Sequence, residues 1–391
     1  MNITMSCGGG TLRVFHLAAG MARRGVLKNI YVPYYSPKFP YLRRFLGRPD
    51  DGQVIPANIV HSNLAAAIGY RVIDKLRLDK IFGFENRFAT WDFIDRCVAA
   101  QLRPGSDVVW AESVLALHTF KKAKQFGSKT ILDRPNCHIR FQKNIVEEEY
   151  SRLGLKRYYN SLQAVEKSEE EYAQADYIAV LSSFVKRSFI AQGVPEKKLL
   201  LLPSGVNLDD FKPAPKEDDT FRIIYCGYIC VKKGVHHLLD ALERLNIPKS
   251  ELWLIGKVEE DFRPILGKTK VVYKHFGYVP HLELSRYYGQ GSVFVLPSIE
   301  EGLAKVTMEA MACGLPVIAT PNTGAEDVMR DGVDGFIVPM RDPAALSEKI
   351  LRLYEDPELR ANMGRNGQAQ VRRGLTFDDY TARVINACRE L

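Results

Sequence analysis

The stretch PSIEEGLAKVTMEAMACGLPVIATPNTGAEDVM, residues 297–329, decides the fold of this chain. The apolar run before it predicts a strand at 292–297, and the pattern after it predicts a loop and then a helix that begins near Lys305. Glu301 stands in the loop and Glu309 stands eight residues later in the helix. This spacing puts both carboxylates near the end of the strand, where they can accept paired hydrogen bonds from vicinal hydroxyls.

Between the two acids, the backbone leads into the start of the helix. The amides of Gly302, Leu303 and Ala304 are the candidate donors there, because a helix N-terminus attracts phosphate. Two glutamates at a loop and a helix are more often surface charges. Spacing alone therefore leaves both a binding site and a solvated acidic face open.

Outward from this stretch, short apolar runs alternate with amphipathic stretches, which is typical of parallel βαβ units. The Pro- and charge-rich segment FKPAPKEDDT, 211–220, reads as a linker between two such series, and the polar stretch 142–174 is predicted to be helical. The fold class is therefore α/β, with two doubly wound Rossmann-like domains that face each other across a cleft. The predicted strands are 2–6, 29–33, 107–111, 129–133 and 177–182, then 221–227, 251–256, 271–277, 292–297 and 316–320.

Composition agrees with two globular domains. The chain has 391 residues, 46% of them apolar and 26% charged, so it is neither disordered nor collagen-like. No apolar run is long enough to span a bilayer, and the start MNITMSCGGG does not read as a secretory signal. The seven cysteines are scattered and form no CxxC pair, which disfavours a disulfide scaffold or a zinc ribbon. We expect a reduced, cytoplasmic protein.

The net charge of +8 is concentrated at the N-terminus. Residues 1–48 contain eight basic side chains, no acidic ones and several aromatic residues. Such a segment predicts contact with an anionic membrane surface or with an acidic or phosphorylated ligand, although a solvated basic face fits as well. Nucleic acid is not expected, since no binding motif accompanies the charge. The eight are Arg13, Arg23, Arg24, Lys28, Lys38, Arg43, Arg44 and Arg48.

The segment PSIEEGLAKVTMEAMACGLPVI resembles the E-x7-E signature of family-four retaining glycosyltransferases, also described as glycosyl transferases group 1, which have the GT-B fold. Two positions depart from the usual wording: Leu303 replaces a Phe, and Ala304 replaces a second Gly. The added methyl of Ala304 puts the geometry of that amide in question. The matching positions are Pro297, Ser298, Glu301, Gly302, Glu309, Ala310, Gly314 and Pro316.

The resemblance extends to both sides of this motif. Residues 175–213 are similar to the family's inter-domain block, and 221–242 to its first nucleotide-domain strand and phosphate loop. In that loop Lys233 matches a family lysine and Lys232 adds a second positive charge, whereas Tyr228 stands where an Arg is usual. Cations near a diphosphate are physically sensible, because the leaving group departs as an anion.

Recognition of the nucleoside is implied at the end of a later strand. In the family, backbone groups of the stretch that matches Gly277, Tyr278 and Val279 often hold the base. Backbone contacts do not reveal base identity, so the resemblance leaves UDP, GDP, ADP and TDP sugars open.

The first domain offers two weaker candidates. Gly9 and Gly10 follow the first strand, in a glycine run that permits close approach of a ligand and fits neither a dinucleotide fingerprint nor a Walker loop. It resembles the family's N-terminal glycine loop beside the transferred sugar. His138, in DRPNCHIR, resembles a family histidine that faces this sugar. A plain tight turn and a hydrogen-bonded structural histidine are the alternatives.

Taken together, the resemblance implies a retaining glycosyltransferase that moves a sugar from a nucleotide-diphosphate sugar to an acceptor hydroxyl, in polysaccharide or glycolipid assembly. It implies that Glu301, Lys233 and His138 are catalytic and that Glu309 holds the ribose. The domains are expected at 1–205 for the acceptor and 206–375 for the donor, with a helix at 376–391 crossing back to the first domain.

No cofactor and no metal are expected, because the sequence has neither a DxD motif at a strand end nor a His/Cys cluster with zinc spacing. A peripheral position on the inner face of the membrane would suit a lipid-linked acceptor. Two other functions remain open: a non-catalytic sugar-nucleotide-binding protein, and a sugar-nucleotide epimerase of the same fold.

Overall fold

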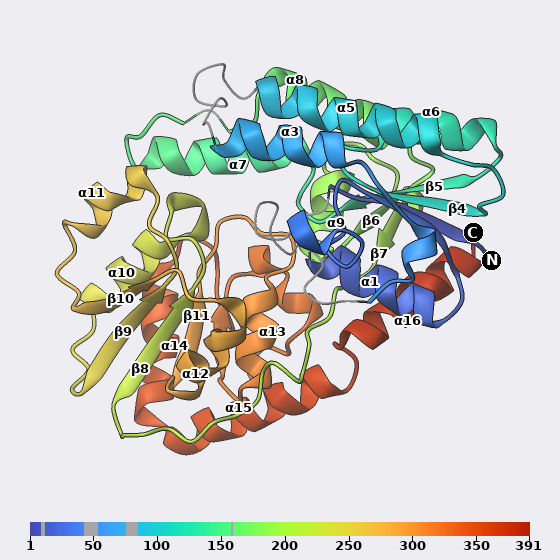
Figure 1. Ribbon diagram of the computed structural model, residues 1–391. Coiled ribbons are helices and arrows are strands. Elements are labelled where there is room, and N and C mark those ends of the chain that lie inside the picture. Colours follow the sequence, from blue (N-terminus) through green and yellow to red (C-terminus); the bar gives the residue numbers. More distant parts are fainter. Residues whose placement is uncertain (9–11, 43–53, 76–84, 158) are drawn as a thin grey trace.

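The computed structural model describes residues 1–8, 12–42, 54–75, 85–157 and 159–391, which form two α/β domains (Figure 1). The strands of the N-terminal domain are β1 (Ile3–Ser6), β2 (Leu27–Val32), β3 (Val60–Ser62), β4 (Val108–Glu112), β5 (Lys129–Arg134), β6 (Tyr177–Val180) and β7 (Leu199–Leu201). Those of the C-terminal domain are β8 (Phe221–Cys226), β9 (Ser250–Ile255), β10 (Tyr273–Gly277), β11 (Val293–Leu296), β12 (Val317–Ala319) and β13 (Gly335–Ile337).

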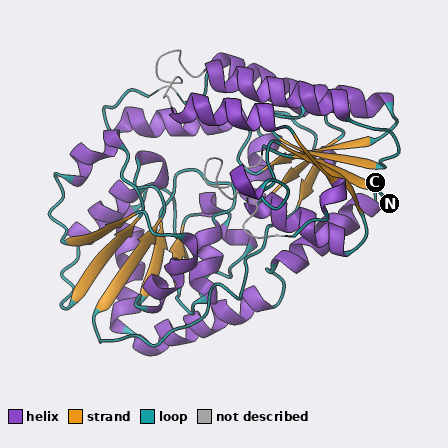
Figure 2. Cartoon of the chain, in the orientation of Figure 1, coloured by secondary structure: helices purple, strands orange, loops and turns teal. Residues whose placement is uncertain are grey.

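Helices lie on both faces of each sheet (Figure 2). In the N-terminal domain they are α1 (Leu12–Arg23), α3 (Leu64–Lys75), α5 (Glu85–Gln101), α6 (Leu117–Gln125), α7 (Ile139–Arg152), α8 (Leu162–Gln174) and α9 (Ser183–Ile190). After β8 they are α10 (Val235–Glu243), α11 (Arg263–Leu266), α12 (Leu284–Gly289), α13 (Lys305–Ala312), α14 (Pro343–Glu355), α15 (Pro357–Arg372) and α16 (Phe377–Arg389).

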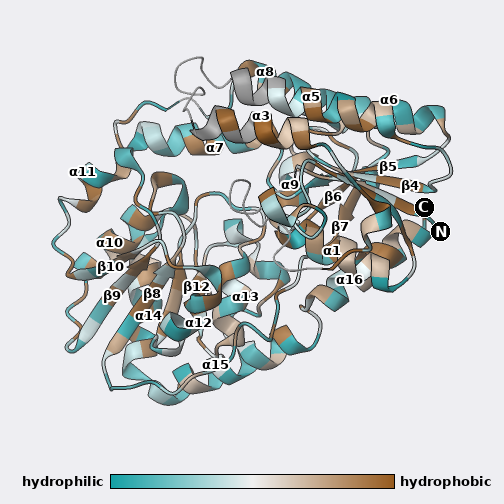
Figure 3. Ribbon diagram, in the orientation of Figure 1, coloured by the Kyte–Doolittle hydropathy of each residue, from teal (hydrophilic) through white to brown (hydrophobic). Residues whose placement is uncertain are grey.

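The described strands pair in parallel, in the orders β3-β2-β1-β4-β5-β6-β7 and β10-β9-β8-β11-β12-β13. Helices cover both faces of such a sheet, so its central strands are apolar along their whole length. The strands β1, β8 and β11 are buried at every position, and the hydrophobic colours of Figure 3 concentrate in the sheets. The expected pair of doubly wound α/β domains is confirmed.

Each sheet reverses its strand order once. The switch lies between β1 and β4 in the first domain and between β8 and β11 in the second. Loops that leave neighbouring strands on opposite sides of a sheet open a crevice at the carboxyl ends, where ligands of this fold bind. The loops that follow β8 and β11 are therefore the first place to look for a site.

Two features differ from the expected elements. The short edge strands β3, β7 and β13 are not among the predicted ones, because three residues carry too little periodic signal. β12 is equally short, but it is predicted from the longer apolar run at 316–320. The polar stretch 142–174 forms two helices rather than one. Gly154, with φ of 70°, follows the end of α7, and the Ser161 hydroxyl accepts from the amide of Ala164 to begin α8.

The chain crosses between the domains twice, at adjacent points. Val206 forms an isolated parallel bridge with Thr376, just before α16 returns to pack on α1 (Figure 1). Gly205 is pressed against the second crossing, since a Cβ there would lie 2.2 Å from the carbonyl of Thr376. A glycine is thus required where the two crossings touch.

A buried ion pair fixes α1 and α16 to the first sheet. The Arg13 guanidinium lies 2.9 Å from the Asp133 carboxylate at the end of β5, and it donates to the hydroxyl of Tyr380 on α16 at 2.8 Å. Trp110 donates to the same carboxylate at 3.2 Å. Of the eight basic residues of the segment 1–48, Arg13 is therefore a core residue and adds no charge to an exposed face.

Arg13→Met should destabilise the N-terminal domain by about 3–5 kcal/mol, because it leaves Asp133 buried without its counter-charge. The measurement is urea unfolding of the whole chain, followed by far-ultraviolet circular dichroism. Arg23→Met is the matched control, since Arg23 pairs with Asp378 on the surface and both side chains are more than half exposed. Equal losses in the two variants would contradict a structural role for the buried pair.

Candidate active site

The loops after β8 and β11 meet at the switch point of the second sheet. The first loop ends in a 3-10 turn, Val231–Lys233, directly before α10. The amide of Ile299, in the second loop, donates to the carbonyl of Lys232 at 2.9 Å. This contact brings the lysine pair 232–233 against the acid pair 300–301.

Lys232 is held in a buried network that joins the domains. Its ammonium lies 2.8 Å from the Glu300 carboxylate, which is fully buried, and it contacts the Tyr159 hydroxyl at 3.2 Å. Gln142 on α7 donates to the same Glu300 oxygen at 3.0 Å. Burial favours the neutral amine, but the Glu300 charge outweighs it and raises the pKa of Lys232 above its ordinary value.

Lys233 forms an ion pair with Glu301. Burial, and then the charge of Lys232, lower the pKa of Lys233 to about 8. With a pKa of about 8, the ammonium is still protonated at neutral pH. The two acids thus neutralise two partly buried cations, and an anionic ligand that enters must take over this pairing.

Glu309 lies one turn into α13 and is buried. One of its carboxylate oxygens is 2.8 Å from the Nε2 of His281, which follows β10. The other oxygen is buried and has no hydrogen-bond partner among the described residues. An acceptor in that state is costly without a ligand, and a hydroxyl pair would satisfy it.

The three predicted phosphate-binding amides are not equivalent. The amide of Ala304 donates to the carbonyl of Thr323 at 3.0 Å, so in this conformation it is engaged within the protein, and its contact with a ligand stays a prediction. Gly302 contacts the first domain: a Cβ there would lie 1.6 Å from the carbonyl oxygen of Pro135. Its own carbonyl accepts from the Ser182 hydroxyl at 2.6 Å. The amides of Gly302 and Leu303 stay predicted phosphate donors.

The candidates for the nucleoside lie at the ends of β8 and β10. Tyr228 is 59% exposed and Tyr278 is 71% exposed, whereas Val279 is buried. Gly277 has a left-handed φ of 65°, and its carbonyl accepts from the amide of Gly256 at 2.7 Å. Lys257 lies over the ring of Tyr278. These positions form one rim at the sheet edge, and their contact with a base stays a prediction.

His138 is buried in the first domain. It precedes α7, its Nδ1 accepts from the amide of Arg140 at 3.3 Å, and its ring packs against Tyr172 and Phe189. Burial lowers the pKa of His138 to about 4. These contacts favour the structural alternative, and a role towards a transferred sugar stays a prediction.

Gly9 and Gly10 lie outside the described residues. Next to them, the amide of Gly8 donates to the carboxylate of Glu112 at the end of β4 at 2.9 Å. This contact holds the entrance of the glycine run at the first sheet's switch point.

The remaining described members of the basic segment have protein partners. Lys28 donates to the carbonyls of Pro104 and Gly105, Lys38 donates to that of Val60, and Arg23 and Arg24 lie near Asp378. Arg43, Arg44 and Arg48 lie outside the described residues. Arg23, whose side chain is 61% exposed, still contributes to a basic surface.

Sequence reasoning missed three members of the charged network. Glu300, Gln142 and Tyr159 fall outside the family wording, and two of them come from the other domain. One signal was present for Glu300: a doubled acid at 300–301 faces a doubled lysine at 232–233. Nothing in the local sequence marks Gln142 or Tyr159.

Fold and site together define a class: two-domain α/β proteins with two parallel sheets and a charged cluster at the switch point of the second sheet. Residues 207–370 match the family model described as Glycosyl transferases group 1, which confirms the resemblance found in the sequence.

Relatives and solved structures agree with this assignment. The chain is 31% identical over 224 residues to the capsular polysaccharide biosynthesis glycosyltransferase CapM of Staphylococcus aureus, over 51% of this chain and 57% of that relative. It is 28% identical over 236 residues to a GDP-mannose-dependent phosphatidylinositol monomannoside mannosyltransferase of Corynebacterium glutamicum, over 54% of this chain and 62% of that relative. The chain thus spans less than two thirds of either relative.

Among solved structures, sucrose-phosphate synthase from Thermosynechococcus elongatus has a TM-score of 0.71 at 20% identity, over 100% of this chain and 99% of that one. Anabaena HepE, solved with UDP-glucose, has a TM-score of 0.69 at 16% identity over 100% of both chains. These likenesses confirm the GT-B fold. Among the described residues, no helix combines the length and apolarity that a membrane crossing requires.

The buried, neutral His138 should make the protein sensitive to acid. An unfolded histidine binds a proton near pH 6.5, while His138 in the fold does so only near pH 4. Between these values the unfolded state binds more protons, so stability falls as the pH is lowered through this window. His138→Asn keeps a capping side chain and should lose less stability than wild type between pH 7 and pH 4, measured by thermal unfolding. His275→Asn, at an exposed histidine, should follow wild type, and parallel curves for all three proteins would contradict the assignment.

Proposed function

We propose that the protein is a retaining glycosyltransferase that transfers a sugar from a nucleotide-diphosphate sugar to an acceptor hydroxyl. The observation that carries this proposal is the pairing of Lys232 and Lys233 with Glu300 and Glu301 at the switch point of the second sheet. Two partly buried cations side by side suit two adjacent phosphates, and the match to the glycosyl transferases group 1 model supports the same ligand.

The reaction follows from this placement of charge. The bond between the anomeric carbon and the phosphate oxygen breaks, and its electron pair leaves with the nucleotide diphosphate. The acceptor oxygen forms a new bond to the same face of that carbon, and its proton passes to the departing phosphate oxygen. Lys232, Lys233 and the amides of Gly302 and Leu303 stabilise the charge that grows on the phosphate, which is the largest electrostatic task in the step.

Glu309 and Glu301 bind the other two parts of the donor, the ribose and the transferred sugar. Glu309 accepts the ribose hydroxyls through the oxygen that has no protein partner, and Glu301 turns from Lys233 to the hydroxyls of the transferred sugar. The contact of Gly302 with Pro135 closes the two domains over the donor. Closure excludes water, so transfer is favoured over hydrolysis of the donor.

The acceptor is a sugar or lipid-linked hydroxyl in polysaccharide or glycolipid assembly. The support is the printed names of the relatives, which act in capsular polysaccharide biosynthesis or on a phosphatidylinositol mannoside. UDP is the first donor nucleotide to test, because HepE was solved with UDP-glucose, and GDP is the second. Approach to an anionic membrane remains a prediction that rests on the basic residues of the segment 1–48.

Nucleotide binding should be visible as a thermal shift, and Glu309→Gln should reduce it. A ligand at one hundred times its dissociation constant stabilises the folded state by about 2.7 kcal/mol. Loss of a charged acceptor for ribose should weaken binding by about tenfold or more. The measurement compares UDP, GDP, ADP and TDP on wild type, on Glu309→Gln and on Glu348→Gln, whose side chain is 67% exposed. No shift with any nucleotide, or equal shifts in all three proteins, would rule out the proposed donor site.

Lys233→Met should lower kcat by about 100-fold, because the departing diphosphate loses a preorganised counter-charge. The readout is release of the nucleotide with a panel of saccharide and lipid-linked acceptors. Lys212→Met is the control, at a lysine that is 67% exposed in the linker. Nucleotide binding without turnover on any acceptor would favour the non-catalytic alternative, and an epimerised donor formed without acceptor would favour the epimerase.

A further inference from the structure

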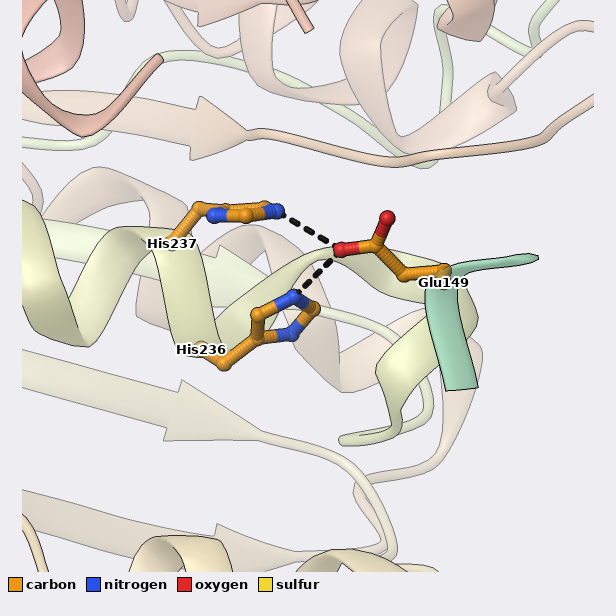
Figure 4. A group of neighbouring side chains, drawn as sticks. All are labelled: Glu149, His236 and His237. Carbon is orange, nitrogen blue, oxygen red and sulfur yellow. Dashed lines mark hydrogen bonds and ion pairs between the residues drawn. The ribbon is translucent and has the colours of Figure 1, made fainter. Parts of the chain in front are cut away.

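A second charged cluster joins the domains on the far side of the phosphate loop. His236 and His237 open α10, and both direct their Nε2 atoms at one carboxylate oxygen of Glu149 on α7 (Figure 4). The distances are 2.7 Å and 2.8 Å. Adjacent histidines and a glutamate from the other domain thus converge on one point.

The cluster is sheltered from solvent. The side chains of Glu149, His236 and His237 are 1%, 5% and 14% exposed. Phe262 lies beside the ring of His236, and the two imidazole centroids are 4.0 Å apart. Three side chains with metal-ligating atoms are therefore held together by packing rather than exposed on a mobile surface.

Only one oxygen of the Glu149 carboxylate is available to a metal ion. Arg341 holds the second Glu149 oxygen with its Nε at 2.5 Å, and it also contacts Glu148 at 3.0 Å. Arg341 reaches them from a left-handed backbone with φ of 63°, which is uncommon for a residue other than glycine. The arginine orients the carboxylate and leaves its first oxygen facing the imidazoles, as outer-shell partners do around metal ligands.

We propose that Glu149, His236 and His237 bind a zinc-class divalent cation that fastens the two domains together. Two imidazole nitrogens and one carboxylate oxygen are the ligand set that zinc takes with a fourth, solvent position. The three ligating atoms lie within 4.8 Å of one another. Tetrahedral zinc needs them about 3.3 Å apart, given metal–ligand distances of about 2.0–2.1 Å. The two Nε2–oxygen separations, now 2.7 Å and 2.8 Å, must widen slightly, and the two Nε2 atoms, which lie within 4.8 Å of each other, must reach the same spacing.

The surrounding charge permits a cation. Arg341 and Arg152 are the basic groups near the cluster, and Glu148 pairs with both of them. Asp240 adds a negative charge on α10, one turn after His236. The ion has no part in sugar transfer. It fixes the start of α10, which follows the phosphate loop, to α7 of the other domain.

The sequence shows no zinc spacing for this cluster, because the third ligand comes from a position 87 residues earlier in the chain than His236. The proposal does not rest on the proposed transferase activity, since metal binding is measured without donor or acceptor.

The test is titration of the metal-free, untagged chain with Co²⁺, followed by displacement with Zn²⁺. We expect one metal per chain, visible absorption from low-coordinate cobalt, and loss of that absorption on adding zinc. His237→Gln and Glu149→Gln should weaken binding by more than about 100-fold, since each removes a ligand. His275→Gln, at an exposed histidine, should bind as wild type does.

A variant that gains a new absorption band distinguishes loss of a metal ligand from simple unfolding. His237→Cys should create a near-ultraviolet thiolate-to-cobalt band, which places position 237 in the coordination sphere. Small-angle scattering should show a more compact wild type with zinc than without it, and no such change in His237→Gln. The proposal fails if wild type binds no stoichiometric metal, if His237→Gln binds equally well, or if wild type already shows the thiolate band.

Discussion

The ion pair between Lys232 and the fully buried Glu300 is the interaction on which the site depends. The Glu300 charge could not stay there alone, because an unpaired buried ion costs several kcal/mol. The pair is possible only where two loops leave neighbouring strands in opposite directions, which requires the reversed strand order at β8 and β11. Gln142 then extends the pair to α7, so the same carboxylate that neutralises the lysine also ties the domains together.

Much of the fold followed from local pattern, because strands buried on both faces are apolar along their whole length. The edge strands β3, β7 and β13 were not predicted, since three residues alone cannot show a hydrophobic period. The break between α7 and α8 depends on Gly154 and on the N-cap at Ser161. It could not be predicted, because the stretch 142–174 is polar throughout.

The residues of the site also divide into those that the sequence predicts and those that it does not. Glu301 and Glu309 belong to the motif at 297–329 and Lys233 to the phosphate loop, so the sequence could place them. Gln142, Tyr159 and Glu149 could not be placed, because they belong to the other domain and meet Glu300, Lys232 and His236 only after folding. Ala304 shows the limit even within the motif, since its amide is taken by Thr323, a residue nineteen positions further along the chain.

The double crossing at Val206 and Thr376 limits how the domains can move. Two chain segments that touch side by side define a single hinge axis between the domains, whereas a single linker would allow rotation in every direction. Because Gly205 is pressed against the other crossing, neither segment can bend without the other. Opening is therefore confined to rotation about this line, and the loops of the two sheets must return to the same register each time they meet.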